Sequence, residues 1–512
     1  MMLGEVDHGI TVTEITPMDQ PIGVRAHTLP AFIGRTLRGP LDTPVLIDSF
    51  AAFTRRFGGT WKRSSLSHAV EQFFAHGGPK LYVIRVANNA IGSGLQLPAG
   101  EGTLMLRAVE PGSTEMLRAA VDYDGIDDDE HFNLIVQRLS PANGVVVDQE
   151  IFERISCDPE STASIIDALE ESAIVELNLP LPERRPNATM GRYADSRTPY
   201  ITPNERGSDG GELCDYDLIG SAVRGTGIFS LNAIAEFDLL YMPPPSGARE
   251  PGPAATLAAE LYCRKRGAML IVDPPSNWDS PRAAAEGTRN AGFTSCNIVS
   301  YFPRLTVEGK TQPAGGALAG LLCKLDVHDG PWAELSGRQF AFNRRLQAEV
   351  EVEEKEERWL HRAGLNAIVT GDDGRLHFTG GVTLGCSGQS DQQFARLTIR
   401  RMCLFIGKAI ESATRWAIFD NDRAHALERV HCQVEEYMHE LAAAGAFADD
   451  HYTVQCELQR DVNAPGTERG LTILLSFTPA SSAEVLALTL YQTVSGSRIA
   501  STAFAPVVEA CA

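Results

Sequence analysis

The sequence predicts a multidomain protein of the α/β (α+β) class. A discontinuous outer α/β domain is interrupted by a β-rich insert and followed by a C-terminal α/β domain, with an extended arm at each end. Three observations lead to this prediction. The chain has 512 residues, which is too many for one ordinary core. Alternating helix and strand patterns occupy residues 21–90 and resume at 216. Short strand-like segments fill residues 91–215 between them.

Residues 1–20 are predicted to form an N-terminal arm that carries one short strand. Ile10 and Val12 alternate with threonines, and Pro21 ends the pattern. A single strand is not stable alone, so this one must pair with another strand. That strand belongs either to the same subunit or to a neighbouring copy.

The outer domain, residues 21–90 plus 216–345, begins with a regular series of elements. The predicted order is a strand at 31–34, a turn at 39–40, a strand at 45–47, a short helix ending at Gly58-Gly59, a helix with one apolar face at 66–74, and a strand at 81–86. After the insert, a helix over 255–266 leads into a strand over 269–272, and another strand follows near 296–301.

The insert, residues 91–215, is predicted to be rich in short strands. Hydrophobic residues alternate with polar ones along three segments, at Leu104, Leu106 and Ala108; at Leu117, Ala119 and Val121; and at Phe132, Leu134 and Val136. The polar stretch 182–213, which is rich in glycine and proline, is predicted to be a loop.

The C-terminal domain is predicted over residues 346–491, with a C-terminal arm over 492–512. Its start includes a charged, solvated run over 350–357. A long helix is expected to begin at Asn421 or Asp422 and to end near Gly445. Strands are predicted at 452–458, 471–477 and 486–491.

Composition limits the classes of function. The formal net charge of −21 would repel nucleic-acid phosphates, so we expect no direct nucleic-acid partner. We find no apolar run of about 18 residues and no leader-like N-terminus. We therefore expect that the protein does not insert into a membrane and that it assembles in the bacterial cytoplasm. The ten cysteines form no CxxC pair and are expected to be small core residues.

Three patterns that resemble catalytic or metal sites have simpler interpretations. Asp273 ends a strand like the one that holds magnesium in P-loop enzymes, but the chain has no GxxxxGK[ST] loop. The acidic cluster over 122–130 lacks EF-hand spacing and is predicted to be a solvated hairpin turn. His431 and Glu435 fit a surface pair, because no second di-iron motif accompanies Glu436 and His439. We therefore predict no catalytic, cofactor-binding or metal-binding residue, and no enzymatic activity.

Several segments, taken in order, resemble the contractile tail sheath proteins of phages, tailocins and related injection systems. They are AFIGRTLRGP, TRRFGG, EQFFAHGGPKLYVIRV, EPGS, FNLIV, PAGGALAG and RLTIRRMCLFIGKAIESATRWAIFDND. Each motif is loose alone, but their order over most of the chain is specific. Two features depart from the family pattern: FTGGVTL replaces a segment that commonly contains Trp-Gly, and the C-terminal arm is long.

The resemblance implies a tail-sheath-like fold and a structural role in a virion or phage tail. Sheath subunits polymerise as helical rings, expected to be hexameric, around a tail tube protein. Baseplate and tail terminator proteins are the other expected partners. Contraction drives the tube through a host cell envelope for genome ejection, without nucleotide. By the same analogy, the C-terminal domain faces the tube and the insert faces outward.

The resemblance also implies roles for residues at the two ends and in the C-terminal domain. The arms are expected to add strands to neighbouring subunits through Ile10, Val12, Glu14, Ile15, Phe504, Val507 and Val508. Contacts with the tube are expected from Arg396, Arg400, Arg401 and Lys408, and an ordinary surface location for these four is the alternative.

Three alternatives stay open at this point. The chain could belong to a cellular contractile injection system rather than to a phage. It could be a baseplate or other non-contractile structural protein with the same fold. It could also be an α/β enzyme of unknown activity.

Overall fold

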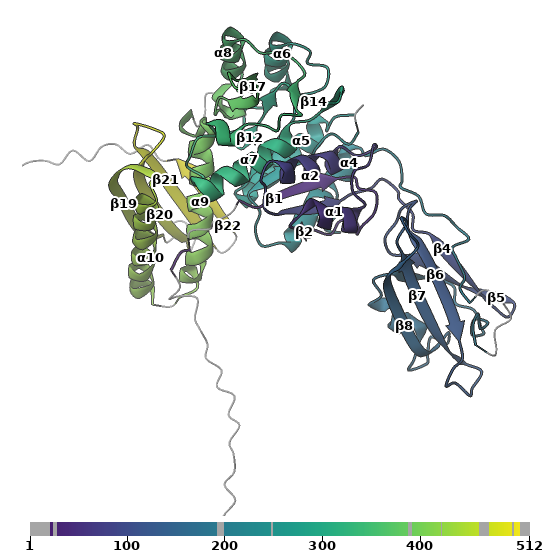
Figure 1. The fold of residues 1–512 in the computed structure, drawn as a ribbon. Helices are drawn as coiled ribbons and strands as arrows, with labels where there is room; N and C mark the ends of the chain where they lie inside the picture. The colour runs from purple at the N-terminus through teal and green to yellow at the C-terminus, as the bar shows by residue number, and fades with distance from the viewer. Residues whose placement is uncertain are drawn as a thin grey trace, which may run out of the picture. The chain divides into compact units, whose positions relative to one another are not determined.

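The computed structural model describes residues 21–23, 28–191, 199–246, 249–387, 392–420, 422–459, 470–493 and 496–501. The described residues divide into two compact units. The first unit contains residues 28–324 and 335–387, and the second contains the described parts of 1–27, 325–334 and 388–512. Figure 1 shows the elements of both units with their labels.

The first unit is built on a six-stranded sheet in the order β12-β11-β10-β1-β3-β2. Its strands are β1 Pro30–Gly34, β2 Val45–Ile47, β3 Leu81–Arg85, β10 Leu239–Tyr241, β11 Met269–Ile271 and β12 Ile298–Val299. All neighbours are parallel except β2, which runs antiparallel to β3. Because β1 pairs with both β3 and β10, strands from before and after the insert form one sheet.

The helices of this unit follow local signals in the sequence. They are α1 Phe50–Phe57, α2 Ser65–Ala75, α4 Asp215–Ile219, α5 Pro253–Arg266, α6 Pro281–Ala291 and α7 Gly315–His328, whose last residues belong to the second unit. The Ser49 hydroxyl accepts a hydrogen bond from the Ala52 N–H at the start of α1, and Gly58 ends that helix with φ of 92°. The order of elements predicted for residues 31–86 is confirmed.

The insert consists of two three-stranded sheets, β4-β5-β9 and β6-β7-β8. Its elements are β4 Gly94–Ala99, β5 Gly102–Ala108, β6 Met116–Asp122, β7 His131–Leu139, β8 Val146–Ser156, α3 Ile165–Glu170 and β9 Val175–Asn178. The hydrophobic residues predicted from the alternating pattern of 104–108, 117–121 and 132–136 are all buried in one core. The β-rich nature of the insert is therefore confirmed.

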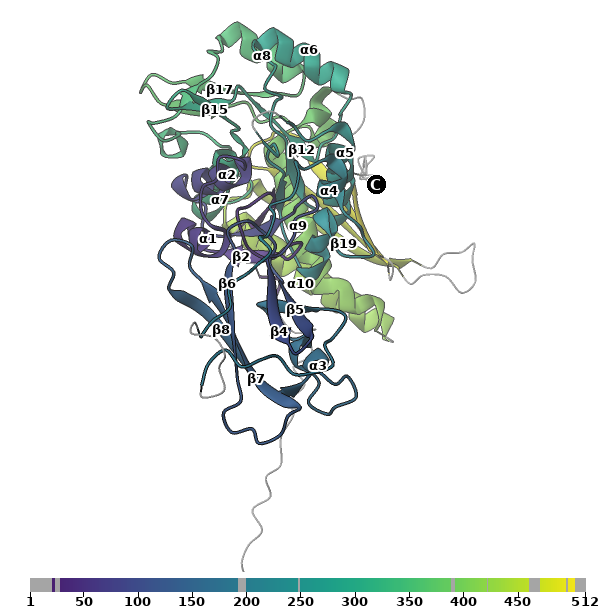
Figure 2. The same ribbon diagram turned by 90° about the vertical axis from the view of Figure 1, so that its right-hand side faces the viewer.

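The remaining elements of the first unit come from both sides of α7, and Figure 2 labels β15, α8 and β17 among them. Before α7 lie β13 Tyr301–Phe302, β14 Leu305–Val307 and β15 Lys310–Gln312, and after it lie β16 Gln347–Ala348, α8 Glu354–Arg362, β17 Asn366–Thr370 and β18 Leu376–Thr379. The sequence predicted a C-terminal domain from residue 346, whereas residues 346–387 lie in the first unit. The reason is packing: Leu360, Leu365 and Leu384 are buried in the same core as α5, α6 and β11.

The second unit contains two helices and a four-stranded antiparallel sheet in the order β19-β20-β21-β22. The elements are α9 Leu397–Thr414, α10 Arg423–Ala443, β19 Phe447–Gln459, β20 Gly470–Pro479, β21 Leu486–Thr493 and β22 Gly496–Ser501. Asp422 caps α10, as predicted, and the helix ends before Gly445. Residues 496–501, which the sequence assigned to the C-terminal arm, pair with β21 of the same chain.

Short 3₁₀ helices complete the description, at Gly227–Ala233, Arg338–Phe340, Leu384–Ser387, Gln392–Phe394 and Arg415–Ile418. No helix in the described part of the chain is long and apolar enough to cross a membrane.

Candidate functional site: the base of the insert and the outer strands of the C-terminal sheet

The insert is joined to the six-stranded sheet by two chain segments that run side by side, residues 88–94 and 205–211. We call these two segments the stalk. Three isolated antiparallel bridges connect them, at the pairs Asn88–Gly211, Ile91–Ser208 and Gly94–Glu205. A Cβ atom on Gly207 would lie 2.2 Å from the carbonyl oxygen of Gly112, so only glycine fits at this close approach.

Two arginines at the ends of sheet strands hold the base of the insert. Arg85, the last residue of β3, is 1% exposed and donates from Nη1 to the Gly39 carbonyl at 2.6 Å and from Nη2 to the Pro111 carbonyl at 2.7 Å. Arg35 follows β1, and its Nη2 donates to the carbonyls of Asp209 and Gly210, both at 3.0 Å. Burial lowers the pKa of Arg85 to about 10, which leaves it charged at neutral pH.

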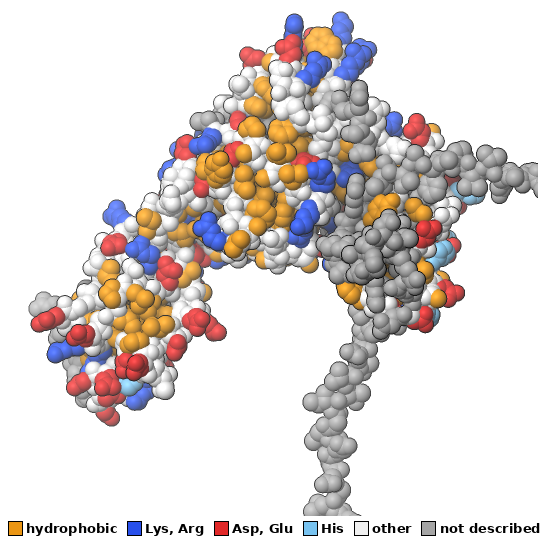
Figure 3. Space-filling view, turned by 180° about the vertical axis from the view of Figure 1, so that it is seen from behind, with side chains coloured by type: hydrophobic (Ala, Val, Ile, Leu, Met, Phe, Trp, Pro, Cys, Tyr) orange, Lys and Arg blue, Asp and Glu red, His pale blue; other side chains and the backbone are white. Residues whose placement is uncertain are grey.

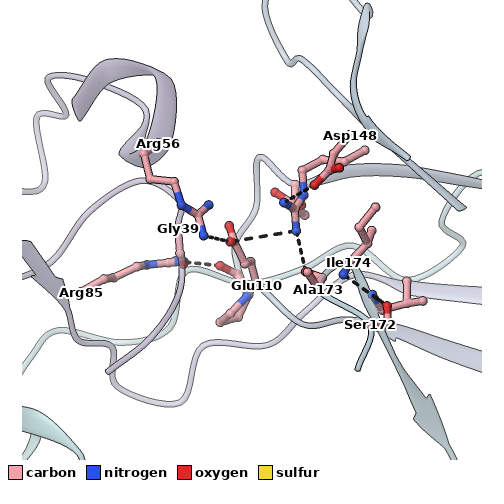
Figure 4. A network of polar contacts seen from close by, with 12 residues as sticks. Gly39, Arg56, Arg85, Glu110, Asp148, Ser172, Ala173 and Ile174 are labelled. Atoms are coloured by element: carbon pink, nitrogen blue, oxygen red, sulfur yellow. Dashed lines mark hydrogen bonds and ion pairs between the residues drawn. The ribbon is translucent and has the colours of Figure 1, made fainter. Parts of the chain in front are cut away.

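Carboxylates surround these arginines and connect the insert to α1. Glu110 forms an ion pair with Arg56 of α1, as Figure 4 shows. It forms a second ion pair, at 4.0 Å, with Arg138 of β7. Arg138 also donates to Glu115 at 2.6 Å. Burial raises the pKa of Glu115, and the Arg138 charge opposes that shift. Together with the stalk bridges, these bonds connect the insert to the sheet and to α1.

This junction was not predicted from the sequence. Its only signal was that Arg85 interrupts the apolar strand LYVIRV. Its hydrogen-bond partners Gly39 and Pro111 are 46 and 26 residues away, so spacing could not identify them.

The sheet of the second unit has two outer strands, β19 and β22. Within the described residues each of them pairs with one neighbouring strand, β20 and β21 respectively. An outer strand presents a row of backbone N–H and C=O groups that can accept a further strand. The sheet therefore has the geometry required for strand addition by another segment.

No protein-family model and no curated protein matches the chain, but solved structures do. A sheath tail protein from Listeria innocua is 12% identical with a TM-score of 0.61, covering 93% of this chain and 97% of that protein. The PVC sheath of an extracellular contractile injection system, in its contracted state, is 12% identical with a TM-score of 0.53, covering 94% and 96%.

The helical sheath of the anti-feeding prophage, also contracted, is 15% identical with a TM-score of 0.53 and covers 94% of this chain and 98% of its own. The chain has the tail sheath fold. The fold class predicted from the sequence is confirmed, and the match extends through both units and the insert.

Within this tail sheath fold, the four basic residues predicted to contact a tube differ in exposure. Arg396 is exposed, and its Nη1 donates to the Ser481 carbonyl at 3.0 Å. Arg400, Arg401 and Lys408 lie on α9 and are at most 9% exposed. Arg401 forms a buried ion pair with Asp326 at the end of α7, and Arg400 lies over the Phe394 ring at 5.0 Å. In this structure Arg396 is the one of the four whose side chain reaches the surface.

The predicted arm residues Ile10, Val12, Glu14, Ile15, Phe504, Val507 and Val508 lie outside the described residues. Their role in linking subunits stays a prediction.

Asp273 has a structural environment in this fold. Its carboxylate accepts hydrogen bonds from the Tyr241 hydroxyl at 2.5 Å and from the Gly315 N–H at the start of α7 at 3.0 Å. Burial raises the pKa of Asp273. The carboxylate thus joins β10 to α7, in agreement with the interpretation of residues 269–273 as a buried strand followed by a turn.

The acidic residues over 122–130 and the histidines of α10 also lie in structural settings. The first group forms the turn between β6 and β7, where Asp128 accepts hydrogen bonds from the backbone N–H groups of Glu130 and His131. His431 and Glu435 are 3.5 Å apart as an i, i+4 pair on α10, as predicted. Within the described residues, no group of three or more His, Cys, Asp or Glu side chains could hold a metal ion.

Proposed function

We propose that this chain is the structural subunit of a contractile tail sheath. It would polymerise as a helical sleeve around a tail tube and contract to drive the tube through a target cell envelope. One observation carries this proposal: the fold matches proteins named as tail sheaths over at least 93% of the chain, and two of these are in a contracted state. The partners are further copies of the chain in hexameric rings, a tail tube protein, and baseplate and tail terminator proteins.

The outer strands of the second unit support a mechanism of linkage. Residues 1–20 and the end of the chain after residue 501 would each add a strand to the sheet of a neighbouring subunit, next to β19 or β22. Each backbone hydrogen bond adds only about 0.5–1.5 kcal/mol net, but every subunit contributes several. Links of this kind hold while the folded units rotate as rigid bodies between two packings.

The role is mechanical rather than enzymatic in this proposal. The extended sleeve would be a metastable state held by the tube and baseplate, and contraction would release free energy stored during assembly. No nucleotide or cofactor takes part. The particle would assemble in the bacterial cytoplasm and act as part of a phage tail, with a cellular injection system as the second setting.

Sedimentation velocity of the purified full-length chain tests the proposal. We expect large species whose amount rises steeply with concentration, and more of them when the candidate tube protein is added. A chain that stays monomeric at high concentration, with and without the tube protein, would contradict the proposal. Hydrolysis of a nucleotide by the purified chain would favour the enzyme alternative instead.

A further inference from the structure

The outer face of α5 is apolar although it faces away from the core. The inner side of this helix packs Ala255, Ala259 and Cys263 into the buried core. On the outer side, Leu257 is 51% exposed and Leu261 is 48% exposed. A helix with apolar residues on both sides is normally covered on both sides.

Neighbouring residues extend this apolar surface. Tyr216 on α4 is 80% exposed, and Pro253 and Ala254 are exposed at the start of α5. We call the surface formed by Tyr216, Pro253, Ala254, Leu257 and Leu261 the α4–α5 face. Figure 3 shows hydrophobic side chains gathered over these helices, with Lys and Arg side chains at the margin. Arg264 and Lys265 in the last turn of α5 are exposed.

The α4–α5 face also adjoins a cavity of about 230 Å³. Pro253 and Thr256 of α5 line it together with Trp278 and Phe293. The cavity can receive an aliphatic side chain from a molecule that docks on the face. An apolar centre with a charged margin is the usual composition of a protein–protein interface.

The insert of the same chain has the complementary chemistry. Residues 91–213 contain 23 acidic and nine basic side chains, a net charge of −14 out of −21 for the whole chain. On its outer strand β8, Val147 and Ile151 are 57% and 53% exposed, and the exposed Asp148 and Glu153 lie beside them. Within the described residues, the strand pairing of β8 over residues 146–153 is with β7.

We propose that the apolar and acidic part of β8, residues 146–153, docks on the α4–α5 face of a second copy of this chain. The hydrophobic side chains of β8 meet Leu257 and Leu261, and its carboxylates meet the basic margin. The contact uses two different surfaces of one chain, so it is heterologous and adds subunits without closing on a dimer. This inference rests on the proposed sheath function, because it assigns one of the contacts by which the sleeve grows.

Two double variants of the full-length chain test the contact. The face variant is Leu257→Asp with Leu261→Asp, and the strand variant is Val147→Asp with Ile151→Asp. All four positions are exposed, so thermal unfolding should be unchanged for both. We expect each variant to need about tenfold more protein than wild type to assemble in sedimentation velocity. Leu46→Asp, at another exposed apolar position, should assemble as wild type.

Mixing the two variants gives the decisive result. Each variant keeps the surface that the other has lost, so the mixture should form a one-to-one complex at a concentration where each alone is monomeric. A mixture that stays monomeric, or either variant assembling as wild type, would overturn the inference while leaving the proposed function intact. Failure of the wild-type chain itself to assemble would instead contradict the proposed function.

Discussion

The guanidinium of Arg85 donates a hydrogen bond of 2.7 Å to the backbone carbonyl of Pro111. This bond joins the last residue of a central sheet strand to the base of the insert, and Arg85 is almost fully buried. Together with the Arg35 bonds to residues 209 and 210, it ties the base of the insert and one segment of the stalk to the sheet. We therefore expect the insert to move with the sheet as one body in the change of packing proposed for the assembled chain.

Replacing Arg85 tests whether the junction is held in this way. Arg85→Met leaves the carbonyls of Gly39 and Pro111 without their donor, and we expect it to lower the free energy of unfolding by about 3 kcal/mol. Denaturant unfolding measures this loss, and limited proteolysis should show faster cleavage in the stalk. Arg289→Met, at an exposed arginine of α6, is the matched control. Equal stability of the two variants would contradict the role of Arg85.

Removing one partner of the buried ion pair between Asp326 and Arg401 should lower the stability of the second unit strongly. Asp326→Leu leaves the Arg401 charge buried without this partner, and we expect a loss of about 3–5 kcal/mol. Adding Arg401→Met to that variant should restore most of the loss, because the buried charge of Arg401 is then removed together with that of its partner. Denaturant unfolding of the two single variants and the double variant measures the coupling. Additive losses would show that the two residues do not act as a pair.

Arg396 is the residue at which a tube contact can be tested without damage to the fold. Its side chain is exposed, so Arg396→Glu should leave the unfolding midpoint unchanged. If this residue contacts the tube, the variant should bind the tube protein less tightly, and the weakening should diminish as salt is raised. Co-sedimentation of sheath and tube measures this. Wild-type binding by Arg396→Glu at low salt would exclude the contact.

His76 should make the stability of the first unit depend on pH. Its Nδ1 lies 2.7 Å from the Gln72 carbonyl and its Nε2 lies 3.2 Å from the Asn343 N–H, which fits a neutral ring that donates at one nitrogen and accepts at the other. Burial lowers the pKa of His76. The unfolded chain therefore binds the proton more readily than the folded one.

The contribution of His76 is present in full above the unfolded-state pKa of about 6.5 and is lost as the pH falls through the lower folded-state value. Between pH 7.5 and 5.5, wild type should lose about 1 kcal/mol more than His76→Gln, whose side chain does not titrate. Denaturant unfolding at both pH values measures the difference. Identical pH dependence in the two proteins would contradict this prediction.

Removal of residues 1–20 tests the linking role of the N-terminal arm. The shortened chain should remain folded, with the circular dichroism and unfolding midpoint of the full chain, but it should no longer polymerise, because it lacks the segment proposed to link subunits. Sedimentation velocity of both chains at the same concentration measures this. Assembly of the shortened chain to the same extent as the full chain would refute the arm role.

The elements over residues 31–86 could be predicted because their signals are local. Ser49 and Gly58 mark the ends of α1, and apolar residues at helical spacing mark the buried side of α2. The three strands of the insert with alternating hydrophobic residues could be predicted equally well, since these hydrophobic residues are all buried in one core. Short-range patterns of this kind are sufficient to predict element type.

The distribution of elements between units depended on contacts that the sequence does not display. Residues 346–387 belong to the first unit because Leu360 and Leu365 pack into its core, which no local pattern indicates. Basic residues of α9 such as Arg401 were expected at the surface, but Arg401 is buried. The sequence does not indicate this, because the partner of Arg401, Asp326, lies 75 residues earlier in the chain. The junction at Arg85 was missed for the same reason.

Negative-stain electron microscopy of the purified full-length chain, with and without the tube protein, tests the central claim most directly. The account predicts long, hollow, striated cylinders, built by repeated heterologous contacts between identical subunits. Particles of single-subunit size at high concentration under both conditions would contradict it.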